Sequence, residues 1–258
     1  MKRSSRELKR IARDMLNNRY SIPMGAFVTA SFIPAVIGIP FSLSLGDYPT
    51  TPQIVIMLLA VYLILLISQV LNAGVILVHQ NMTRNLPYKL TTMFDPFRRG
   101  TERYFLAAFL LSLLSIVCCL PLIGGCIFFY FAETAESTMI FVPILCGILS
   151  VLLMLFLILN YNFVFFFLLD YPEMKVTASF KESRLLMKKN KCRLFYLLCS
   201  FLGWGFVILL SFEIASLWII PYMNQTILTF YLDCTGELDR IPVRDYNTAP
   251  SSSSNSTF

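Results

Sequence analysis

Apolar stretches alternate with short polar ones along most of the chain. A helix needs roughly 20 residues to cross the ~30 Å hydrocarbon core of a bilayer. Six stretches approach or exceed that length, and each odd-numbered stretch is joined to the next by a short turn. The pattern predicts an all-α membrane protein with six transmembrane helices in three hairpins, at residues 22–45, 54–78, 104–131, 140–169, 195–212 and 214–232.

The N-terminal polar segment has the periodicity of an amphipathic helix. Ser4 and Glu7 have the spacing of a capping box. Cations lie off the apolar face, so the helix can rest on an anionic leaflet with its charges among the headgroups. A solvated cytoplasmic helix is the alternative. The apolar face consists of Leu8, Ile11, Ala12, Met15 and Leu16, and the cations are Arg6, Lys9, Arg10 and Arg13.

A second basic segment runs directly into an apolar one between residues 171 and 204. Ser179 and Glu182 again have capping-box spacing. Three cations, Lys181, Arg184 and Lys188, share one helical face. This junction has the pattern of a cytoplasmic amphipathic helix that enters the membrane.

Composition supports the membrane assignment. Charged residues make up 14% of the chain and hydrophobic residues 57%, whereas a soluble domain has about 25% charged residues. The apolar stretches leave no room for a large soluble domain, so we expect one membrane domain over residues 1–240. The polar residues 241–258 are expected to form a disordered cytoplasmic tail.

The distribution of charge predicts the orientation. All 21 Lys and Arg residues fall before residue 22, between 79 and 103, between 170 and 193, or after 232. The turns on the other side carry only acidic charges, at Asp47, Glu133, Glu136 and Glu213. The positive-inside rule therefore predicts a multi-pass cell-membrane protein with both termini in the cytoplasm.

The order of these segments suggests a threefold repeat over residues 1–85, 86–173 and 174–240. Arg19, Arg103 and Arg193 each precede the first apolar stretch of a hairpin, at spacings of 84 and 90 residues. In the second apolar stretch of each hairpin, an amide residue lies eight positions before a polar residue at the cytoplasmic end of that stretch. These pairs are Asn72 and Gln80, Asn162 and Asp170, and Gln225 and Asp233.

Amide side chains are the candidates for chemistry within the bilayer. An unsatisfied amide is costly in lipid, so these residues should face the interior of the bundle. They can form hydrogen bonds between helices, which is the simpler interpretation, or line a path for a polar substrate. The candidate cluster is Gln69, Asn72, Asn160, Asn162, Asn224 and Gln225.

Basic and tryptophan residues at the ends of the apolar stretches are candidate interface anchors. They are expected to hold the ends of the helices at the lipid headgroups. The candidates are Arg19, Arg103, Lys188, Lys191, Arg193, Trp204 and Trp218.

Signatures of enzymes and cofactor sites are absent from the sequence. His79 is the only histidine and lies at the end of an apolar stretch, where an interfacial position is expected. We therefore predict no enzyme activity, no metal and no cofactor.

The seven cysteines are odd in number and lie mostly in apolar stretches, unlike a disulfide framework. The net charge of +6 is accounted for by membrane topology, so no nucleic-acid partner is expected.

The C-terminal third contains a series of short motifs in a characteristic order: Ser183, Met187-Lys188, Asn190-Lys191, Arg193-Leu194-Phe195, Gly203-Trp204, Trp218 and Pro221-Tyr222. With these motifs it resembles a bacterial family of integral membrane proteins known as domain of unknown function 975. Lys189 stands where the family usually has glycine. The resemblance implies a Gram-positive cytoplasmic-membrane protein, and it transfers no catalytic residue because the family has no established activity.

Two functions fit these observations. The first is a non-enzymatic membrane protein that binds lipid, through anionic headgroups, or a protein partner at the cytoplasmic leaflet, with a homo-oligomer as one form of partner. The second is a small transporter or export component with a polar path lined by the amides of the second helix of each hairpin.

Overall fold

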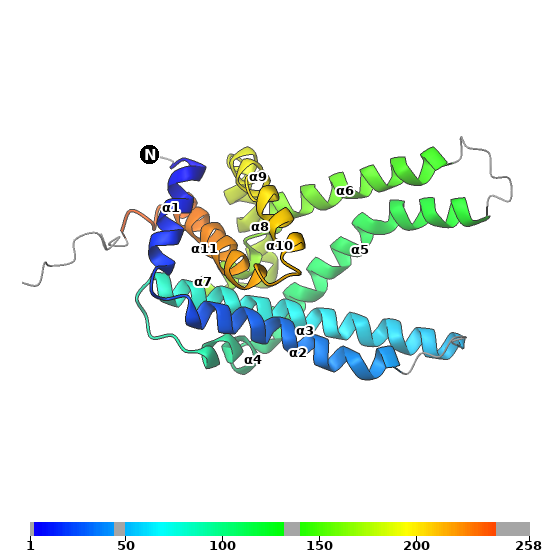
Figure 1. The fold of residues 1–258 in the computed structure, drawn as a ribbon, viewed down its shortest axis with the longest axis horizontal. Helices are drawn as coiled ribbons and strands as arrows, with labels where there is room; N and C mark the ends of the chain where they lie inside the picture. The colour runs from blue at the N-terminus through cyan, green and yellow to red at the C-terminus, as the bar shows by residue number, and fades with distance from the viewer. Residues whose placement is uncertain (1–2, 44–49, 132–139, 241–258) are drawn as a thin grey trace, which may run out of the picture.

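The computed structural model describes residues 3–43, 50–131 and 140–240, and these residues form helices and connections without any strand. The all-α prediction is confirmed. The predicted disordered tail and the turns with Asp47, Glu133 and Glu136 lie outside the described residues. Figure 1 shows α1 (Ser5–Leu16), α2 (Ser21–Leu43), α3 (Thr51–Thr83), α4 (Asp95–Arg98), α5 (Thr101–Phe131), α6 (Phe141–Tyr161), α7 (Val164–Asp170), α8 (Val176–Met187), α9 (Lys191–Cys199), α10 (Leu202–Leu210) and α11 (Ser216–Thr235), with the short 3-10 helix η1 (Leu90–Phe94) before α4.

Five segments of the described chain are long and apolar enough to cross a membrane, which makes this a membrane protein. They are Ser21–Leu43, Thr51–Thr83, Thr101–Phe131, Phe141–Asp170 and Lys191–Leu210. The predicted sixth span is not among them, so the count of six stays unconfirmed. The reason is visible in α11, which carries the polar residues Asn224, Gln225, Thr226 and Thr229 within its length.

The long helices lie in two pairs. Helix α2 packs along α3, and α5 packs along α6. Figure 1 shows that both pairs extend well beyond the turn between α10 and α11. With 33 residues α3 is about 50 Å long, whereas α11 with 20 residues is about 30 Å long. The outer parts of the long helices expose apolar side chains, as expected for surfaces that face lipid.

Pro121 lies inside α5, which bends along its length in Figure 1. A proline within a helix disturbs the backbone hydrogen bonds of the neighbouring turn. Here the backbone N–H of Leu122 donates to the hydroxyl of Ser150 on α6, at 3.0 Å. The buried serine thus satisfies a backbone group that has no water to bind within a bilayer.

Helix α1 buries its apolar face against protein. Leu8, Ile11, Ala12 and Leu16 are buried in one cluster with residues of α11, and α1 packs along that helix. The apolar face is therefore not free to enter a leaflet, in contrast to the expectation from the sequence. The predicted cap is present, since the backbone N–H of Glu7 donates to the hydroxyl of Ser4.

The second predicted cap is wrong. Helix α8 begins at Val176 instead of after Ser179, and the hydroxyl of Ser179 donates to the carbonyl oxygen of Val176. Ser179 is fully buried, so its position is determined by packing against the neighbouring helices. The expected turn between the last two apolar stretches is present, with positive φ angles at Phe212 and Glu213.

Gly74 is where η1 approaches α3 most closely. A Cβ atom on Gly74 would lie 1.8 Å from the carbonyl oxygen of the buried Met93. We expect Gly74→Ala to displace η1 and to lower the free energy of unfolding by about 1–3 kcal/mol, a typical cost of overpacking. Thermal unfolding in detergent micelles measures the change.

Gly124→Ala is the matched control, because nothing lies within 4 Å of its added Cβ. Alanine favours a helix more than glycine does, so this variant should be as stable as the unchanged protein or slightly more stable. Equal stability of the two variants would contradict the close packing of η1 on α3.

Candidate functional site

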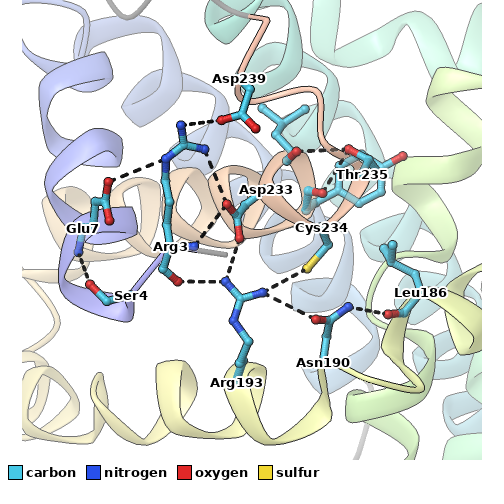
Figure 2. Close-up of polar contacts among 12 residues, drawn as sticks. Arg3, Ser4, Glu7, Leu186, Asn190, Arg193, Asp233, Cys234, Thr235 and Asp239 are labelled. Carbon is cyan, nitrogen blue, oxygen red and sulfur yellow. Dashed lines mark hydrogen bonds and ion pairs between the residues drawn. The ribbon is translucent and has the colours of Figure 1, made fainter. Parts of the chain in front are cut away.

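Arg193 lies at the centre of a cluster of charges that joins three parts of the chain (Figure 2). Its Nη2 lies 2.6 Å from Oδ2 of Asp233, near the end of α11. Arg3 approaches Oδ1 of the same carboxylate at 3.4 Å, and its carbonyl oxygen accepts a hydrogen bond from Arg193. The side chain of Asp233 is only 2% exposed, so both of its oxygens are paired away from solvent. The cluster fixes the N-terminus and the start of α9 to the end of α11.

Asp170 is the centre of a second cluster, at the end of α7. Its Oδ1 accepts from Nε2 of Gln80 at 3.0 Å and from Nη1 of Arg84 at 2.7 Å. Its Oδ2 accepts from the hydroxyl of Tyr231 at 2.7 Å. One carboxylate thus joins the end of α3 and the C-terminal half of α11 to the end of α7.

Arg84 is shared between Asp170 and Glu237. Its Nε and Nη2 donate to the two carboxylate oxygens of Glu237, at 2.7 and 2.9 Å. Burial by itself lowers the pKa of Arg84, but the hydrogen bonds and charges of Glu237 and Asp170 outweigh it and raise the pKa. Arg84 therefore remains charged. A pocket of about 490 Å³ lies beside this cluster, with the guanidinium of Arg84 and the carboxylates of Asp170 and Glu237 in its wall.

His79 is buried between α3 and α11, with 1% of its surface exposed, so the expected interfacial position is wrong. Its Nδ1 lies 2.8 Å from Oε1 of Gln225, and Nε2 of Gln225 donates to the hydroxyl of Thr83 at 2.7 Å. Because the Gln225 oxygen can only accept, His79 carries its proton on Nδ1. Nε2 of His79 is then a buried acceptor without a partner in the described residues.

A cavity of about 160 Å³ lies beside His79. Asn162 and Asn224 also line it, so polar groups from α3, α11 and the α6–α7 connection meet there. Nδ2 of Asn162 is a buried donor without a partner among the described residues. The cavity therefore has room for a few water molecules or one small guest, with a donor and an acceptor in its wall.

The six predicted amides do not form one cluster. Asn162 and Asn224 line the cavity, and Gln225 binds His79 beside it. Asn160 is buried elsewhere and donates to the carbonyl oxygen of Phe156, and Gln69 is half-buried.

Asn72 contradicts the prediction that every amide faces the interior, because its side chain is exposed. It lies seven residues, about two helical turns, before His79 and therefore on the same face of α3. Helix α11 covers that face at His79 through Gln225.

The three predicted arginine anchors take equivalent positions. Arg19 precedes α2 and donates to Oδ1 of Asn85, just after α3, at 3.1 Å. Arg103 in α5 donates to the carbonyl oxygens of Leu168 and Tyr171 at the end of α7, both at 3.2 Å. Arg193 in α9 pairs with Asp233 near the end of α11. Each arginine thus joins the start of one helix pair to its end, and the threefold repeat stays a prediction.

The remaining anchors differ in their surroundings. Lys188 is exposed after α8, and the ammonium of Lys191 lies over the ring of Phe156 at 5.0 Å. Trp204 and Trp218 are 42% and 51% exposed. The cysteines form no disulfide among the described residues. No group of three metal-ligating side chains occurs within the described residues.

The partners of the arginines could not be found from the sequence alone. Gln80, Asp170 and Asp233 are visible as polar ends of apolar stretches, but their contacts join residues up to 230 positions apart. Thr83 and Tyr231 give no signal, because their side chains are common in apolar helices.

These features define an all-α membrane protein whose helices are joined at one end by buried ion pairs and hydrogen bonds. The family described as Protein of unknown function (DUF975) matches residues 1–237, so the chain belongs to that family. None of the curated proteins and none of the solved structures matches the chain.

Asp233 and Asp239 provide a matched test of the Arg193 cluster, since both carboxylates pair with Arg3. Asp233→Asn removes the negative charge between two arginines and should lower the free energy of unfolding by about 3 kcal/mol. Asp239 is 61% exposed, and Asp239→Asn should cost less than about 1 kcal/mol. Equal shifts in thermal unfolding would show that the buried pair has no special role.

Proposed function

We propose that this is a non-enzymatic membrane protein of the cell membrane whose cytoplasmic side binds anionic phospholipid headgroups. One observation carries the proposal: the cations divide into two sets. Arg3, Arg84 and Arg193 pair with carboxylates at the helix ends. The exposed cations form no ion pair within residues 3–43, 50–131 and 140–240; they are Arg6, Arg10, Arg13, Lys89, Arg98, Arg99, Lys175, Lys181, Arg184, Lys188, Lys189 and Arg240.

This division matters because a carboxylate partner offsets the charge of a paired cation, which therefore attracts an anionic ligand only weakly. An unpaired cation near an anionic membrane surface contributes about 1 kcal/mol to binding. All of these exposed cations except Arg240 lie in the three basic segments that precede the apolar stretches, and Arg240 follows the last stretch. The positive-inside rule therefore assigns them to the cytoplasmic leaflet together with both termini. At the cytoplasmic leaflet, lipid headgroups would contact these cations before a soluble partner does.

The buried polar groups support a non-catalytic role. The carboxylates of Asp170 and Asp233 are held by hydrogen bonds and ion pairs, and His79 Nδ1 is held by Gln225. A protein partner, including a second copy of the chain, remains an alternative ligand for the same basic surface.

Native mass spectrometry of the purified full-length protein tests the lipid proposal. The protein in micelles is offered equal amounts of phosphatidylglycerol and phosphatidylcholine, and we expect it to retain more phosphatidylglycerol. Replacing Lys181, Arg184 and Lys188 by Gln should lower the ratio of the two lipids by about fivefold per cation removed.

Glu182→Gln is the control on the same helix. It removes a negative charge and should leave the lipid ratio unchanged or raise it. If the protein without substitutions retained no more phosphatidylglycerol than phosphatidylcholine, the proposed function would be overturned.

A small transporter or export component is the second candidate. It is favoured by the cavity in which His79, Asn162 and Asn224 meet, with an unpartnered donor and acceptor in its wall. The exposed side chain of Asn72 limits the path that the amides can line. Only part of the predicted cluster therefore supports this candidate.

Reaction with diethylpyrocarbonate tests the second candidate, because the chain has a single histidine. A water-connected path predicts that Nε2 of His79 reacts in the folded protein, as followed by ultraviolet absorbance. Asn162→Leu with Asn224→Leu should then slow the reaction several-fold by making the cavity wall apolar. Reaction only after unfolding would count against a path and leave a structural role for the amides.

A further inference from the structure

The two tryptophans of the chain line the same pocket. Trp204 lies in α10 and Trp218 in α11, and the pocket between them has a volume of about 370 Å³. The other lining residues are Arg13, Tyr20, Ile219 and Tyr222. Four aromatic side chains and one cation from distant parts of the sequence thus share one opening.

Contacts behind the pocket hold its walls in place. The ring of Phe201 meets that of Tyr222 edge to face, with centroids 5.7 Å apart. The ammonium of Lys9 lies 4.0 Å from the centre of the Phe201 ring and donates to the carbonyl oxygen of Ser200 at 3.1 Å. The hydroxyl of Tyr222 approaches the carbonyl oxygen of Lys9 at 3.4 Å. These contacts fix α1 against the α9–α10 segment and α11.

Arg13 gives the pocket its charge. Its side chain is exposed, lines the pocket and forms no ion pair with another described residue. A guanidinium matches the geometry of a phosphate, to which it can donate two parallel hydrogen bonds. Tryptophan and tyrosine favour the membrane interface, where one part of the ring contacts acyl chains and the other contacts headgroups.

We propose that this pocket binds the headgroup of one anionic phospholipid. Arg13 donates to the phosphate, while Trp204, Trp218 and Tyr20 contact the glycerol backbone and the first part of the acyl chains. The volume falls within the usual range of ligand pockets. The inference rests on the proposed function and specifies where on the protein one lipid is held.

Tryptophan fluorescence reports on this pocket alone, because the 258-residue chain has only two tryptophans. Phosphatidylglycerol with brominated acyl chains is titrated into the full-length protein in micelles. We expect it to quench the fluorescence at a lower mole fraction than brominated phosphatidylcholine does. Arg13→Gln should raise the mole fraction needed for half-maximal quenching by phosphatidylglycerol about fivefold and leave that for phosphatidylcholine unchanged.

Arg10→Gln is the matched control, since Arg10 is an exposed cation of α1 that does not line the pocket. It should leave the quenching unchanged, and Arg13→Lys should retain part of the preference. Equal effects of Arg10→Gln and Arg13→Gln would overturn the proposal that this pocket binds the lipid. A preference for phosphatidylglycerol in the mass spectrum would still support the proposed function in that case. Displacement of the quencher by inorganic phosphate at the same concentration would overturn the assignment to a lipid.

Discussion

The hydrogen bonds of Asp170 bring together the three parts of the chain on which the fold depends. A carboxylate at the end of α7 can remain charged away from solvent only if donors surround it. Gln80, Arg84 and Tyr231 supply those donors from α3, from the residue after it and from α11. The same requirement explains the Asp233 cluster with Arg3 and Arg193. Both clusters lie where the helix pairs converge, so the ends of the helices are joined by charge as well as by apolar packing.

This arrangement separates two roles of positive charge. The arginines with buried carboxylate partners hold helices together, and their removal should affect stability first. The exposed cations have no such partners in the described chain and are available to ligands. Arg13 belongs to the second set, but the fold places it beside Trp204 and Trp218. The proposed binding of anionic headgroups would therefore be selective for one lipid at this position.

The sequence predicted the helices well and their contacts poorly. Apolar length identified the five segments that can cross a membrane, and the spacing of Ser4 and Glu7 identified the first cap. Ser179 and Glu182 have the same spacing, yet Ser179 lies within α8, because burial there outweighs the local capping signal. His79 likewise lies at the end of an apolar stretch, but α11 covers it.

What the sequence by itself determined is the all-α membrane class, the basic segments and the family. These properties follow from composition, length and local spacing, which do not depend on distant residues. The tertiary structure decided which polar groups meet: Asn162 and Asn224 share a cavity with His79, whereas Asn72 remains exposed. It also decided which cations are paired. Such contacts depend on how helices that are far apart in the chain pack against one another. They also depend on where a short helix pair such as α10 and α11 ends. The hydropathy of the sequence carries no information about the packing or about that end point.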